Sequence, residues 1–171
     1  WDMNIFVLDL NPYKAASYYD DVRLPKMVVE LYQQMGSALR RHGAVDEQMP
    51  LTKTTKRPLR GGYHNHPCTR WVGDTRDNFI WASIHAATLA EEFERRFGKS
   101  HYCADGIEKM FHLRELIPCG DMTPFAQAMP DEYKHDDPVL AYRRYYKSKA
   151  DSKGGIRYKH TKQPYWWEMI A

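Results

Sequence analysis

Two long stretches of this chain place apolar residues at the spacing of an α-helix, and they limit the possible folds more than any other feature. In residues 23–42 the apolar positions are Val28, Leu31, Tyr32, Met35 and Leu39. In residues 74–97 they are Phe79, Ala82, Ala86, Leu89, Phe93 and Phe97. Gly43 and Gly98 directly follow these stretches, where a glycine commonly ends a helix. Two amphipathic helices with facing apolar stripes predict a helical core.

The remaining elements are shorter. We expect three further helices, one beginning after the cap residue Asn11, one over residues 105–116 and one beginning at Pro138. Residues 5–10 are apolar and form either a short strand or a buried extended segment. Residues 43–64 show no periodicity, and we interpret them as a long loop, a kind of segment that is often functional.

The composition fits one soluble domain. The chain has 171 residues, of which 43% are hydrophobic, and no apolar run approaches the roughly 18 residues of a membrane span. Three cysteines are too few for a disulfide framework and indicate a reducing compartment. We therefore expect a mainly α fold: one compact helical domain over residues 1–171 with a short N-terminal extended segment and long loops. The C-terminal segment, residues 138–171, is expected to pack on it. We also expect a cytoplasmic monomer with no membrane partner.

The net charge is only +3, but the basic residues are gathered in two regions. The first region holds Lys53, Lys56, Arg57, Arg60 and Arg70. The second holds Arg143, Arg144, Lys147, Lys149, Lys153, Arg157, Lys159 and Lys162, interleaved with tyrosines and tryptophans. Basic side chains neutralise phosphates and flat rings stack on bases, so this pattern favours nucleic-acid binding. The alternative is that both regions are ordinary solvated surface.

Four polar residues of the first long helix share one face, because Arg23, Lys26, Glu30 and Gln33 follow the spacing i, i+3, i+7 and i+10. A carboxylate between two cations is held ionised and can serve as a base or stabilise a cationic intermediate. The alternative is an exposed face on which Lys26 and Glu30 form an i,i+4 pair worth about 0.3 kcal/mol.

The stretch GGYHNHPCTRW, residues 61–71, concentrates reactive side chains in one place. Zinc is conceivable because His64, His66 and Cys68 alternate here, but the usual paired cysteines are absent, and we predict no metal site. The letters HNH do not continue into the hairpin and helix of the nuclease motif with that acronym. His66 can act as a general acid or phosphate contact, and Asn65 can cap or orient it. The chain has no glycine-rich phosphate loop or dinucleotide fingerprint, so we expect no cofactor.

Two short motifs resemble a known family. The first consists of Asp20, Arg23, Leu24, Lys26, Val29, Glu30 and Gln33, and the second of Asn65, His66, Pro67, Arg70 and Trp71. Together they resemble the pyrimidine-dimer DNA glycosylases of the phage endonuclease V type. The later stretches at residues 123–133 and 141–146 resemble uncharacterised phage proteins. The family likeness covers the N-terminal part of the chain.

The resemblance implies a helical protein that grips a distorted duplex and flips a nucleotide out of the stack. It implies that an amine attacks the sugar C1′ and releases the base, after which β-elimination can cut the strand. Glu30 matches the catalytic carboxylate. The amine is either the N-terminal α-amine or that of Lys26. We expect a glycosylase, with or without AP-lyase activity, acting on damaged or modified pyrimidines in duplex DNA. The alternatives are a non-catalytic nucleic-acid-binding protein and a transferase that modifies DNA bases.

The expected site residues divide into two sets. The catalytic set is Glu30, Lys26 and His66. The DNA-binding set is Arg23, Asn65, Arg70, Trp71, Lys56, Arg57, Arg60, Arg143, Arg144 and Lys147.

Overall fold

The protein is mainly helical. The computed structural model describes residues 4–152 and 154–170, which contain six α-helices and no strand, only an isolated bridge between Leu51 and Pro58. The helices are α1 (Pro12–Ser17), α2 (Leu24–Arg41), α3 (Pro67–Asp74), α4 (Arg76–Phe97), α5 (Ala104–Phe111) and α6 (Pro138–Ser148). Short 3₁₀ turns occur at Asp46–Gln48, Arg114–Leu116, Asp131–Tyr133, Lys149–Asp151 and Trp167–Met169. None of the described helices has the length and hydrophobicity needed to cross a bilayer.

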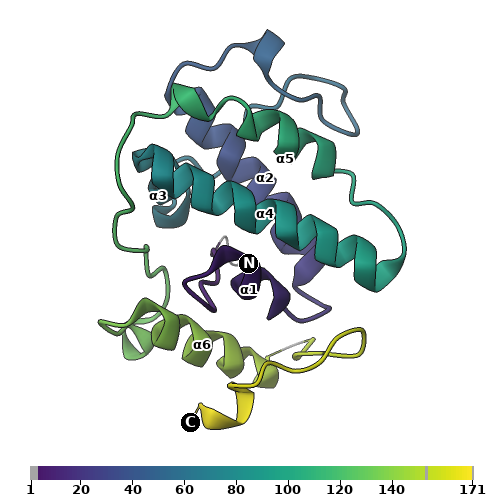
Figure 1. Cartoon of the computed structure of the whole chain (residues 1–171), viewed down its shortest axis with the longest axis vertical. Helices are drawn as coiled ribbons and strands as arrows, with labels where there is room; N and C mark the ends of the chain where they lie inside the picture. Colours follow the sequence, from purple (N-terminus) through teal and green to yellow (C-terminus); the bar gives the residue numbers. More distant parts are fainter. Residues whose placement is uncertain (1–3, 153, 171) are drawn as a thin grey trace.

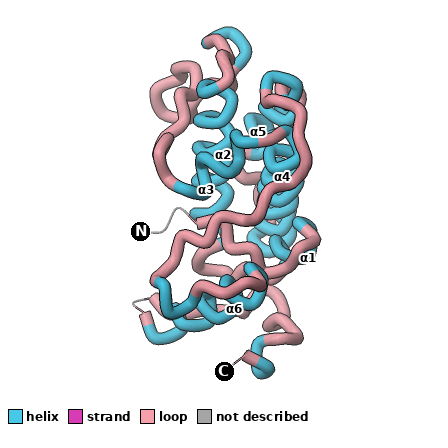
Figure 2. The backbone as a smooth tube through the Cα atoms, turned by 90° about the vertical axis from the view of Figure 1, so that its left-hand side faces the viewer, coloured by secondary structure: helices cyan, strands magenta, loops and turns pink. Residues whose placement is uncertain are grey.

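The helices form an elongated, single compact domain. Helices α2 to α5 make a bundle at one end, and α6 with the C-terminal segment occupies the other end (Figure 1). The N-terminal segment and α1 lie between them, as the side view also shows (Figure 2). The loop after α2 lies at the far end of the bundle from α6 (Figure 1).

Helices α2 and α4 pack against each other and supply the centre of the core, as their periodicity predicts. All five residues of the predicted α2 stripe are buried. In α4 the stripe is buried from Phe79 to Leu89 and half-buried at Phe93 and Phe97. Thr75 caps the start of α4 by accepting from the Asn78 N–H, and α4 ends at Gly98 in the left-handed region, with φ +73°.

Several boundaries differ from the sequence prediction. The long helix expected from residue 74 starts at Arg76, because Thr75 is extended and separates it from α3, which was not predicted. The helix expected over residues 105–116 ends at Phe111 and continues only as a 3₁₀ turn. Residues 4–8 are a buried extended segment rather than a strand. The Tyr19 hydroxyl takes the place of a neighbouring strand there, since it accepts from the Phe6 N–H at 2.8 Å and donates to the Phe6 carbonyl at 3.0 Å.

Two buried carboxylates join the C-terminal segment to the rest of the molecule. Asp20 accepts from the Tyr146 hydroxyl at 2.5 Å and from the Arg157 N–H at 3.1 Å. Asp21 accepts from the Lys159 N–H at 2.7 Å. Because the acceptors precede α2 and the donors lie in α6 and beyond it, these bonds hold the two ends of the chain together.

Candidate nucleic-acid interface

The first basic region, residues 53–70, is here called the basic segment, and it is fixed firmly to α2. The Ser37 hydroxyl donates to the Gly62 carbonyl at 2.7 Å and accepts from the Gly62 N–H at 2.8 Å. Gly61 has φ +82°, and a Cβ at this position would lie 2.4 Å from the Ser37 nitrogen. The Arg40 guanidinium donates to the Leu59 carbonyl at 3.1 Å. The long loop is therefore held in one place, and glycine is required where it touches α2.

The cations of the basic segment are exposed to solvent. The exposed residues are Lys53, Lys56, Arg57, Arg60 and Arg70. Among the described residues, none of the five forms an ion pair, whereas arginines elsewhere in α2, α4 and α6 do. Lys56 and Tyr63 have φ of 57° and 56°, an uncommon conformation for residues other than glycine. Such strain is tolerated only where the surrounding structure holds it, and it gathers at functional sites.

A cavity of about 450 Å³ opens between the basic segment and α2. Its lining consists of Val29, Tyr32, Gln33, Thr52, Lys53, Thr54, Thr55, Tyr102 and Cys103. The Tyr102 side chain is 55% exposed, and the Lys53 ammonium lies 4.6 Å from the centre of its ring. Burial raises the pKa of Cys103 to about 12, which keeps its thiol protonated and makes it a poor nucleophile. Sequence reasoning did not single out Tyr102, whose partner Lys53 is far away in the chain.

The Asn65-His66-Pro67 turn starts α3. His66, rather than Asn65, is the cap: its Nδ1 accepts from the Cys68 N–H at 3.1 Å, and Pro67 occupies the first helical turn. Asn65 and Arg70 are exposed on either side of His66, which is half-buried. The turn therefore presents polar side chains next to the basic segment.

The structure places Glu30 in the core. Its side chain is only 5% exposed, so the expectation that it shares a polar face with its neighbours is wrong for this residue. Lys26 is exposed, and Gln33 lines the cavity beside the basic segment. The helical spacing is as predicted, but the rest of the fold covers that face of α2 at Glu30. Arg23 is half-buried and donates to the Gly155 carbonyl at 2.8 Å, which ties it to the C-terminal segment.

Glu30 lies near a buried group of polar side chains. Burial raises the pKa of Tyr19 well above its ordinary value, and the nearby Cys68 and Glu30 raise it further. The Tyr19 hydroxyl also contacts His85 Nε2 at 3.1 Å. Burial lowers the pKa of His85 to about 4, so this ring is neutral at physiological pH. Buried ionisable groups in contact occur both in active sites and in structural networks. The N-terminal amine, the first nucleophile that the resemblance implies, lies outside the described residues.

Three other predicted contacts are placed differently. Trp71 is 4% exposed and donates from its indole N–H to the Thr123 carbonyl at 3.2 Å, so it belongs to the core rather than to a DNA-contacting surface. Arg143 donates to the Leu8 carbonyl at 2.8 Å. Lys147 donates to the Trp167 carbonyl at 2.7 Å. Arg144, by contrast, is exposed.

The histidines and cysteines that raised the question of zinc have separate structural roles. Cys68 is buried, and His101 Nδ1 accepts from the Cys103 N–H at 3.0 Å while its Nε2 faces the Pro25 carbonyl at 3.2 Å. Within residues 4–152 and 154–170, no three His, Cys, Asp or Glu side chains gather as metal ligands would.

Comparison with known proteins does not identify a family for this chain. No family model, curated protein or solved structure matches the chain.

Proposed function

We propose that this protein binds duplex DNA through the basic segment. The observation that carries the proposal is a set of exposed cations that form no ion pair with the described residues. Four of them, Lys53, Lys56, Arg57 and Arg60, lie on a loop anchored by Ser37 and Arg40, and Arg70 follows in α3. Exposed lysines and arginines gain most from a polyanion, because neutralising phosphates releases condensed counterions. A fixed scaffold lowers the entropy lost when these side chains meet a backbone of regular phosphate spacing.

The neighbouring cavity supports the same proposal. Its volume of about 450 Å³ lies within the usual range of small-molecule sites, roughly 300–1,000 Å³. Tyr102 offers a ring for stacking, Lys53 a positive charge, and Thr52, Thr54 and Thr55 hydroxyl groups. In a duplex with one nucleotide flipped out of the stack, such side chains contact the unstacked base and its phosphate.

The test is the affinity for a short duplex, measured by fluorescence anisotropy at moderate salt. The triple variant Lys56→Gln, Arg57→Gln and Arg60→Gln is expected to bind at least about tenfold more weakly, a loss of about 1.4 kcal/mol. The control variant changes three exposed cations elsewhere, Lys14, Lys99 and Lys134, to glutamine and so makes the same change in net charge. Equal affinities for both variants would refute the proposed interface.

A second candidate function, a DNA glycosylase, is favoured by one observation. The carboxylate that the family resemblance marks as catalytic, Glu30, is buried and close enough to Tyr19 to raise the pKa of its hydroxyl. An active-site carboxylate in a low-dielectric setting acts more strongly on a developing charge than one in water. In this proposal Lys26 or the N-terminal amine attacks C1′, and His66 with Arg70 contacts the sugar or phosphate.

Glu30→Gln tests this second candidate, since it keeps the size of the side chain and removes its charge. If Glu30 is catalytic, DNA affinity stays within a few-fold while base release falls by roughly 100-fold or more. The substrates are ultraviolet-irradiated and pyrimidine-modified duplexes, and Glu47→Gln, an exposed acid, is the control. Wild-type activity that survives the mutation in full removes Glu30 from the mechanism.

Borohydride trapping separates the candidates, because only an imine between the protein and the sugar is reduced to a stable crosslink. The glycosylase is expected to crosslink to its substrate duplex. A protein that binds DNA tightly but neither crosslinks nor releases a base fits the non-catalytic alternative. Transfer of a group onto a DNA base, without base release or strand cleavage, fits the transferase.

A further inference from the structure

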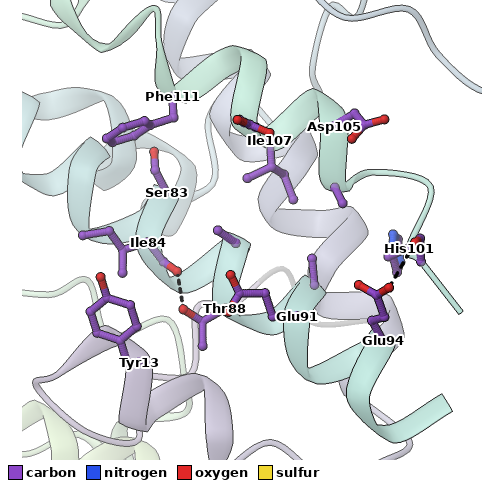
Figure 3. A pocket seen from close by; sticks show the side chains of 15 residues that line it. Tyr13, Ser83, Ile84, Thr88, Glu91, Glu94, His101, Asp105, Ile107 and Phe111 are labelled. Atoms are coloured by element: carbon purple, nitrogen blue, oxygen red, sulfur yellow. Dashed lines mark hydrogen bonds between the residues drawn. The ribbon is translucent and has the colours of Figure 1, made fainter. Parts of the chain in front are cut away.

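A large groove lies on a different part of the molecule from the basic segment, between α4 and α5, with α1 at one end. Its volume is about 780 Å³. Figure 3 shows apolar side chains on both sides: Ile84 from α4, and Ile107 and Phe111 from α5. Tyr13 of α1 closes one end and is 58% exposed (Figure 3). The lining also includes the small residues Ala87, Ala90 and Ala104.

The rims of this groove are acidic. Glu91 and Glu94 lie one turn apart on α4, and Asp105 and Glu108 lie one turn apart on α5. Among the described lining residues there is no lysine or arginine. Burial lowers the pKa of His101, the one histidine of the lining, so it adds little positive charge. In a protein of net charge +3, this groove concentrates negative charge.

The arrangement of the carboxylates indicates what kind of cation fits. No three of them come together as metal ligands within the described part of the chain, so a single small ion does not match the site. Glu94 accepts from the Ser100 hydroxyl at 3.4 Å, and Glu91, Asp105 and Glu108 form no ion pair with described residues. The carboxylates are therefore placed to bind several separate positive groups, spaced along the α4 rim and the α5 rim.

We propose that this groove binds a basic amphipathic helix of a partner protein. Such a helix lays apolar side chains at i, i+3, i+4 and i+7 into a hydrophobic groove. Here that stripe contacts Ile84, Phe111 and Tyr13, while Ala87 and Ala104 allow the partner backbone to come close. Lysines or arginines on the flanks of the stripe reach Glu91 on one rim and Glu108 on the other. The apolar floor distinguishes this ligand from a simple polyamine, which would use the carboxylates alone. A DNA backbone is repelled from this face, so the site is separate from the basic segment.

The experiment uses a synthetic lysine–leucine peptide of about 15 residues with one apolar stripe, long enough to form a helix. Binding is measured by titration calorimetry, and amide shifts locate it on the protein. We expect shifts confined to α4, α5 and the start of α1. The double variant Glu91→Gln and Glu108→Gln is expected to weaken binding at least about tenfold. Ala87→Arg, at an exposed position of the groove, is expected to abolish it by bulk and charge.

Matched controls make the test decisive. Glu47→Gln with Glu132→Gln removes two exposed acids elsewhere and is expected to leave peptide affinity unchanged. A peptide of the same composition with its leucines scattered around the helix is expected to bind at least about tenfold more weakly. The proposal is overturned if the ordered peptide causes no shifts, if both double variants bind it alike, or if spermine binds as tightly and displaces it.

Discussion

The two basic regions of this protein look alike in the sequence but differ in what their charges contact. In the basic segment, Lys56, Arg57 and Arg60 extend into solvent and form no ion pair with the described residues. In α6, Arg143 and Lys147 turn inward and bond the protein's own carbonyl groups. A cluster of basic residues in the sequence therefore indicates either an exposed charged surface or a means of holding a terminal segment.

The inward cations of α6 are also enclosed by aromatic rings. The Arg143 guanidinium lies 4.7 Å from the ring centre of Trp166 and within 3.5 Å of the Asp9 carboxylate. Lys147 reaches both the Trp167 and the Ile170 carbonyl, the latter at 2.8 Å. These contacts satisfy the charges internally, so fewer remain available for DNA at this end of the molecule than the composition suggests.

The largest expected effect comes from breaking the C-terminal attachment at Asp20. Asp20→Ala removes the acceptor of the Tyr146 hydroxyl and the Arg157 N–H and leaves both donors unsatisfied near the core. We expect a loss of about 3–5 kcal/mol in the free energy of unfolding, measured by urea denaturation. Asp151→Ala, an exposed acid of the same region, is expected to cost less than about 0.5 kcal/mol. A small effect at Asp20 would mean that the segment is not held as described.

Low pH is expected to destabilise the protein through His85, which contacts the Pro12 carbonyl and the Tyr19 hydroxyl in the N-terminal part of the chain. Its folded pKa of about 4 lies below the ordinary value of 6.5, so the unfolded chain binds the proton first as pH falls. The stabilisation is complete above pH 6.5 and is lost towards pH 4, in total about 3 kcal/mol. The free energy of unfolding, measured by denaturation at several pH values across this range, is expected to change less steeply with pH for His85→Asn than for wild type. The exposed His64→Asn serves as control and should keep the wild-type slope.

A smaller difference in stability is expected between substitutions at two neighbouring residues of α6, Arg143 and Arg144. Arg143→Gln loses its bond to the Leu8 carbonyl and its position over Trp166, and we expect a cost of about 1–3 kcal/mol in stability. Arg144→Gln changes an exposed side chain and is expected to cost less than about 0.5 kcal/mol. Thermal unfolding of the two variants gives the comparison directly. Equal losses would contradict the distinction between inward and outward cations.

The helical core could be predicted because local spacing determines it. The stripe from Val28 to Leu39 is buried as expected, since any compact fold must cover it. The burial of Glu30 could not be predicted, because it depends on segments outside α2 that fold over it. In the same way, nothing local to Arg143 reveals that it will donate a hydrogen bond to the Leu8 carbonyl, far away in the chain. The roles of the site residues in DNA chemistry stay predictions.

The central claim is that the cations of the basic segment meet phosphates and the inward cations of α6 do not. The most direct test is the slope of log affinity for a duplex against log salt concentration. Each lost phosphate contact lowers its magnitude by about 0.9. The variant with Lys56, Arg57 and Arg60 changed to glutamine is expected to lower it by roughly 2.7, and the variant with Arg143 and Lys147 changed to glutamine is expected to leave it unchanged. An unchanged slope in the first variant, or an equal loss per residue in the second, would contradict the account.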